Sequence, residues 1–163
     1  MKLLGAFLIL CCGVLAGCTA ARSLEQKAAY LRLLRQMVTA MMQELSGSLP
    51  LTADLLQHLA EMQAFRTLGF LQQAAQNPDA FPQSWADAVR SDRALTPESA
   101  EVLCGIGQTL GSTGLEGQLA ALSLALERLG ALQAEAERLA AGKGNLYRSL
   151  GVLGALFAAI LLL

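Results

Sequence analysis

The sequence has few of the side chains on which enzymes usually rely. His58 is the only histidine among 163 residues, so neither a histidine-based metal cluster nor a histidine dyad can form. A phosphate-binding loop is also missing, because Glu137 occupies the place of its first glycine and Gly144 that of its Ser or Thr. The net charge of −1 gives no basic surface for nucleic acid. We expect no enzymatic activity, no cofactor, no metal and no small-molecule substrate.

The four cysteines are not spaced like zinc ligands or like a disulfide framework. Cys11, Cys12 and Cys18 lie in an apolar N-terminal segment, and Cys104 lies alone in the middle of the chain. Adjacent Cys11 and Cys12 lack the two-residue spacing of a typical zinc pair, and no second pair exists. We interpret all four as small hydrophobic side chains.

Charge is absent from both ends of the chain. The sequence is 54% hydrophobic and 15% charged, and residues 3–21 and 149–163 carry no charge at all. A helix that crosses a hydrocarbon core of about 30 Å needs about 20 apolar residues. We therefore predict transmembrane helices at residues 1–21 and 146–163, of which the second is the shorter span.

Basic residues cluster on the inner side of both apolar segments. Only Lys2 precedes the first segment, and no basic residue follows the last. The basic residues between them and close to their ends are Arg22, Lys27, Arg32 and Arg35 on one side and Arg138, Lys143 and Arg148 on the other. Because positive charge favours the cytoplasmic side, residues 22–145 are predicted to form a cytoplasmic domain attached to the cell membrane.

A second interpretation of the N-terminus remains open. Residues 15–18 read Leu-Ala-Gly-Cys, which resembles the lipobox of a bacterial lipoprotein behind a signal peptide. Cys18 would then carry lipid, and the domain would be exported. The second apolar segment and the basic residues after Cys18 argue against this alternative. Gly13 and Gly17 form a GxxxG pattern, which favours close helix packing.

The middle of the chain has the pattern of an all-α helical bundle. Leu24, Leu31, Val38 and Leu45 recur every seven residues, and no helix breaker separates them from the first apolar segment. The expected elements are one long helix through 23–45, helices at 51–64, 65–76 and 82–90, a turn at 77–79, a helix from 97, a helix over 115–141, and a hinge at 142–144. The predicted fold is a bundle of about six helices flanked by the two transmembrane helices.

Four residues of the middle domain have special expected roles. Thr96 precedes a proline and an acidic residue, which predicts a helix start. Trp85 can anchor a partner, although a core position is favoured. Gly107 and Gly111 each cost about 1 kcal/mol inside a helix relative to Ala. Their spacing of four indicates close packing of another helix or a helix C-terminus.

The sequence as a whole resembles stage III sporulation protein AB of endospore-forming bacteria. The most specific part is residues 146–154, Leu-Tyr-Arg-Ser-Leu-Gly-Val-Leu-Gly, which include the helix-packing candidate Gly151. Residues 110–118 and 122–129, the opening 2–6, and Glu44 followed by Leu-Pro-Leu at 49–51 also fit. The lipobox-like tetrapeptide is not a feature of that resemblance.

The resemblance implies a membrane platform protein of a secretion-like sporulation complex. Its helical domain would be similar to the cytoplasmic domains of type II secretion and type IV pilus platforms. It would lie in the mother-cell membrane facing the forespore, within a channel-like complex, and dock a cytoplasmic ATPase, stage III sporulation protein AA. Glu44, Glu61, Arg66 and Arg90 are candidate interaction residues, because charges at the rim of an interface steer association.

Overall fold

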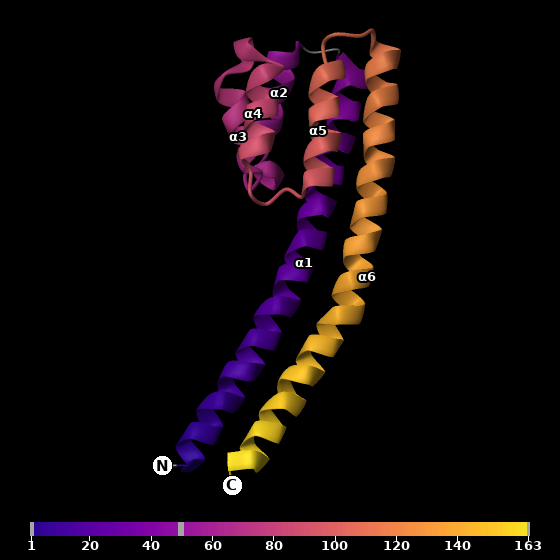
Figure 1. Ribbon diagram of the computed structural model, residues 1–163. Helices are drawn as coiled ribbons and strands as arrows, with labels where there is room; N and C mark the ends of the chain where they lie inside the picture. The colour runs from indigo at the N-terminus through magenta and orange to yellow at the C-terminus, as the bar shows by residue number, and fades with distance from the viewer. Residues whose placement is uncertain (1, 49–50, 163) are drawn as a thin grey trace. The chain divides into compact units, whose positions relative to one another are not determined.

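The chain folds entirely as helices over the residues that its structure describes. The computed structural model describes the backbone of residues 2–48 and 51–162, and the side chains of 22–48, 51–142, Ser149 and Leu153. No strand occurs in these residues, in agreement with the expected all-α fold. Figure 1 shows the α-helices α1 (Lys2–Ser48), α2 (Thr52–Glu61), α3 (Gly69–Gln76), α4 (Gln83–Ser91), α5 (Pro97–Thr109) and α6 (Leu115–Leu162). Two 3₁₀ turns lie between them, at Gln63–Phe65 and Pro78–Ala80.

The chain divides into two compact units. One unit comprises Met1–Ala29 and Gln133–Leu163, and the other comprises Tyr30–Leu132. Most side chains of the predicted membrane segments 1–21 and 146–163 lie outside the described residues, and so do the surroundings of the candidates Gly13, Gly17 and Gly151. Among the residues whose side chains the structure describes, no helix is both long enough and apolar enough to cross a membrane.

The unit Tyr30–Leu132 contains a continuous hydrophobic core. The predicted stripe of α1 faces this core, because Leu31, Val38 and Leu45 are all buried. The largest fully buried side chains come from the helices and from the residue before α3, and they are Leu34, Met37, Met41, Leu55, Leu56, Leu59, Leu68, Phe70, Leu71, Trp85, Leu103 and Leu122. Burial of side chains of this size stabilises a fold by about 1.5–3 kcal/mol each.

Helix α6 continues without interruption through the residues expected to form a hinge. The expectation of a hinge at 142–144 is wrong, since all three residues are helical. A glycine costs a helix only about 1 kcal/mol relative to Ala, which a long helix without proline tolerates. Glycine composition alone therefore did not decide where this helix ends.

The expected helix at 65–76 begins later than the sequence pattern indicates. Residues Gln63–Phe65 form a 3₁₀ turn, Leu68 is extended with φ −82° and ψ 92°, and α3 begins at Gly69. Phe65 and Leu68 are both buried, so the chain turns here to place both side chains in the core. The side-chain amide of Gln72 donates to the carbonyl of Ala60 at 2.8 Å and ties α3 to α2.

Both ends of α5 are fixed by local interactions. The Thr96 hydroxyl accepts a hydrogen bond from the backbone N–H of Ser99, and the Ser99 hydroxyl accepts one from the backbone N–H of Thr96. This capping box satisfies two N–H groups that the first turn of the helix leaves unpaired. At the other end Gly111 has φ +76°, a backbone conformation that favours glycine.

Candidate interaction surface

Trp85 lies in the core and holds α4 against α5. Its indole Nε1–H donates to the carbonyl oxygen of Leu103 at 2.7 Å, and its ring meets Phe70 edge-on, with centroids 5.3 Å apart. The side chain is 1% exposed, so it is unavailable to a partner. Its role is to fix the position of α5 in the bundle.

Gly107 provides the space that Trp85 occupies. A Cβ atom at this position would lie 2.5 Å from Trp85 Cδ1, well inside van der Waals contact. Gly111 differs, because it lies beyond the end of α5 and a Cβ there would lie 2.7 Å from Thr52 Oγ1. The two glycines therefore have separate structural surroundings.

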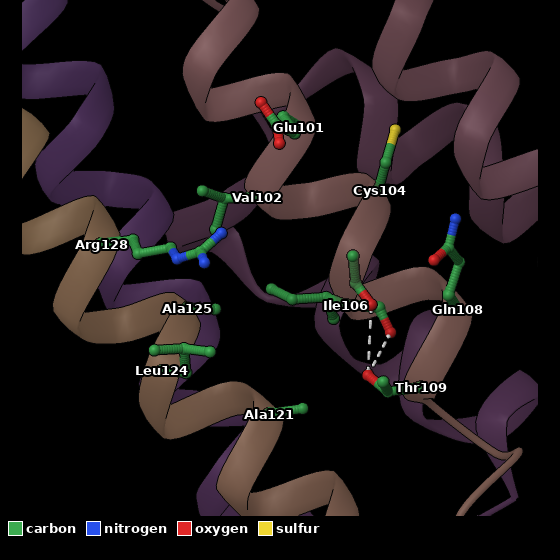
Figure 2. A pocket seen from close by; sticks show the side chains of 11 residues that line it. Glu101, Val102, Cys104, Ile106, Gln108, Thr109, Ala121, Leu124, Ala125 and Arg128 are labelled. Carbon is green, nitrogen blue, oxygen red and sulfur yellow. Dashed lines mark hydrogen bonds between the residues drawn. The ribbon is translucent and has the colours of Figure 1, made fainter.

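A groove lies between α5 and the first part of α6, as Figure 2 shows. Its volume is about 420 Å³. Its lining residues are Glu101, Val102, Cys104, Gly105, Ile106, Gln108 and Thr109 from α5, and Ala121, Leu124, Ala125 and Arg128 from α6. Val102, Ile106 and Ala125 are buried, whereas Leu124 is 52% exposed. The groove thus combines an apolar floor with polar ends.

The charged residues of this groove lie on opposite walls. Glu101 on α5 and Arg128 on α6 are both exposed and occupy the same end of the groove in Figure 2. They form no ion pair with each other in the described part of the chain. The sequence pattern did not single out these two residues. Leu124 was the one sign of the groove in the sequence, because it lies outside the apolar stripe of α6, whose leucines are spaced by four and three.

The four charged residues proposed from the sequence do not form one cluster of ion pairs. The Glu44 carboxylate lies 3.4 Å from His58 Nε2, and Arg90 lies 3.8 Å from Asp87. Glu61 and Arg66 are exposed, and neither makes an ion pair among the described residues. Glu61 and Arg66, which flank the 3₁₀ turn Gln63–Phe65, are therefore the two of the four without an ion-pair partner in the described residues.

A half-buried polar contact joins α1 to the loop before α5. The Tyr30 hydroxyl donates to Asp92 Oδ2 at 2.8 Å, and Asp92 Oδ1 accepts the backbone N–H of Ala94 at 2.9 Å. Burial of the ring, together with the hydrogen bond and the nearby carboxylate, raises the pKa of Tyr30 well above its ordinary value. Tyr30 therefore stays neutral in the folded chain.

This contact predicts a loss of stability at high pH. The pKa of Tyr30 is raised by folding, so its contribution is fully present below the unfolded value of about 10 and declines as pH rises above it. Tyr30→Phe should lower the free energy of unfolding at pH 7 by about 1–3 kcal/mol. The same substitution should also flatten the decline in the free energy of unfolding between about pH 9 and 12. Urea unfolding of the native and Tyr30→Phe chains across this pH range measures both effects. If the free energies of unfolding of the two chains fell in parallel with pH, Tyr30 would not be the group responsible for the decline.

No metal-binding group is evident in the part of the chain that the structure describes. Groups of three or more His, Cys, Asp or Glu side chains that could hold an ion do not occur there. His58 is exposed on α2, where it faces Glu44.

Comparison with known proteins agrees with the resemblance seen in the sequence. A solved structure named "Stage III sporulation protein AB" matches with a TM-score of 0.57 and 24% identity, over 71% of this chain and 96% of its own. At that identity the match establishes a shared fold. Comparison with curated proteins gives no match. The family model for stage III sporulation protein AB matches residues 2–163. The chain therefore belongs to the stage III sporulation protein AB family.

Proposed function

We propose that the chain is a membrane platform of a secretion-like sporulation complex and that its helical domain docks a cytoplasmic ATPase. The observation that carries this proposal is the family match over residues 2–163. The ATPase is the one named by the sequence resemblance, stage III sporulation protein AA. A protein without a nucleotide site can join an energised process by contacting a protein that has one.

The proposed topology places the docking domain in the compartment of the ATPase. Residues 1–21 and 146–163 span the mother-cell membrane facing the forespore, and residues 22–145 lie in the cytoplasm. Support comes from the uncharged residues 3–21 and 149–163 and from the basic residues on their inner sides.

Glu61 and Arg66 are the side chains that we assign to the first contact with the ATPase. Both are exposed, and neither has an ion-pair partner in the described residues that would have to be displaced. Exposed charges act on association over a distance of about 8–10 Å at physiological salt. They change association rates and salt dependence more than they change the lifetime of a complex.

Binding of the full chain in detergent to the purified ATPase tests this proposal. Glu61→Lys and Arg66→Glu should each slow association by roughly three- to tenfold, and salt should weaken binding of the native chain. Glu116→Lys is the matched control, because Glu116 is exposed on α6 away from the 3₁₀ turn in sequence, and it should bind normally. Salt-independent binding, or equal effects of all three variants, would contradict the assigned contact.

A deletion strain tests the function itself. Loss of the gene should reduce the yield of heat-resistant spores severely and leave vegetative growth unchanged. A normal spore yield would end the proposal. Labelled palmitate that is incorporated into the native chain but not into Cys18→Ala would instead favour the exported lipoprotein.

A further inference from the structure

The groove between α5 and α6 contains a glycine that the fold does not require. A Cβ atom at Gly105 would meet nothing within 4 Å, whereas Gly107, two residues later, accommodates Trp85. Glycine in a helix interior is less favourable than alanine by about 1 kcal/mol. Within the described structure no neighbour fills the space that Gly105 leaves, so another molecule can approach the helix backbone here.

An exposed leucine faces solvent from the opposite wall. Leu124 of α6 is 52% exposed and lines the same groove as Gly105. Its side chain lies outside the core that Leu122 and Ala125 enter from the same helix. An apolar side chain on one wall and a missing side chain on the other have the complementary shapes of a knob and a hole.

The charges of the two walls are also complementary. Glu101 stands on the α5 wall and Arg128 on the α6 wall, at the same end of the groove. Glu98 lies three residues before Glu101 and is exposed as well, so the α5 wall is acidic. A uniformly acidic or basic partner would meet a like charge on one wall. A second copy of this surface presents the opposite charge to both walls.

We propose that this groove is the contact surface between two copies of the chain. A two-fold axis parallel to α5 and α6 places each α5 against the partner's α6. Glu101 then faces the partner's Arg128, and Leu124 covers the partner's Gly105, each contact occurring twice. The arrangement goes beyond the proposed docking of an ATPase, which uses other residues.

The mass of the full chain in detergent, measured by light scattering with the detergent contribution subtracted, tests the proposal. The native chain should be dimeric. Glu101→Arg and Arg128→Glu should each weaken dimerisation by at least about fivefold, because each puts like charges together twice. The double variant Glu101→Arg with Arg128→Glu should restore the dimer. A native chain that is monomeric at all concentrations, or a double variant as weak as the single variants, would overturn the proposal.

Gly105→Leu provides a second test that does not depend on charge. The leucine fills open space in the single chain but blocks the approach of the partner's Leu124, so we expect a folded monomer. Gly47→Leu is the matched control, since Gly47 is also an exposed helical glycine with nothing within 4 Å, and it should remain dimeric. If Gly47→Leu alone becomes monomeric, the contact lies on another surface and the proposal fails.

Cys104 allows the same contact to be tested in membranes. Cys104 lines the groove, and replacing Cys11, Cys12 and Cys18 with serine leaves it as the single thiol of the chain. A bismaleimide should join two copies through Cys104, and Arg128→Glu should lower the yield at least about fivefold. Equal cross-linking of the native and Arg128→Glu chains would contradict the arrangement.

Discussion

Trp85→Ala is expected to lower the free energy of unfolding by about 3–5 kcal/mol, the typical cost of removing a large buried aromatic side chain. Trp85 is 1% exposed and donates its indole hydrogen to Leu103, so the change removes packing and a hydrogen bond together. It also removes the edge-on contact with Phe70. A domain of this size has a stability of about 5–15 kcal/mol, so this loss is a large part of the total.

Urea unfolding of the full chain in detergent, followed by circular dichroism, measures this effect. Trp85→Phe retains an aromatic ring but not the hydrogen bond to Leu103, so its free energy of unfolding should lie between those of the native and Trp85→Ala chains. Leu51→Ala is the control, because Leu51 is 74% exposed and its removal should change stability by less than about 0.5 kcal/mol. Equal stability of the Trp85→Ala and Leu51→Ala chains would show that Trp85 is not a core residue.

Gly107→Ala and Gly105→Ala are expected to change stability in opposite directions. A methyl group at Gly107 would lie 2.5 Å from Trp85 Cδ1, and the ring is held by its bond to Leu103 and cannot easily move. Overpacking of this kind costs about 1–3 kcal/mol. At Gly105 the methyl group meets nothing within 4 Å, so alanine should stabilise α5 by up to about 1 kcal/mol.

The contact with Trp85 can be isolated by a double-mutant cycle. In a Trp85→Ala background the clash at Gly107 disappears, so Gly107→Ala should become neutral or stabilising. Thermal melts of the four chains in the same detergent provide the comparison. A penalty at Gly107 that persists without Trp85 would show that a different neighbour causes it.

The helical periodicity predicted the core-facing sides of the long helices. Leu31, Val38 and Leu45 are buried because a side chain that recurs every seven residues stays on one face of a helix. Thr96 predicted the start of α5 because a hydroxyl before a proline is suited to a helix N-terminus. These features depend on neighbours within about one or two helical turns, so the sequence alone contains them.

Tertiary packing decided where α3 begins, whereas the hinge that is absent from α6 has a local cause. The turn before Gly69 exists because Phe65 and Leu68 are both needed in the core, although the local pattern indicates a continuous helix. The hinge expected at 142–144 is absent, because glycine weakens a helix without ending it.

The groove is the clearest case in which the sequence was insufficient. Glu101 and Arg128 belong to different helices, and only the pairing of α5 with α6 places them at one end of a common surface. Gly105 and Gly107 are the same residue type in the same helix, yet one faces the groove and the other faces Trp85. Composition and periodicity determined that this protein is helical and which faces are apolar. Packing between helices determined which glycine has a structural neighbour and which charges share a surface, because those contacts join residues distant in the chain.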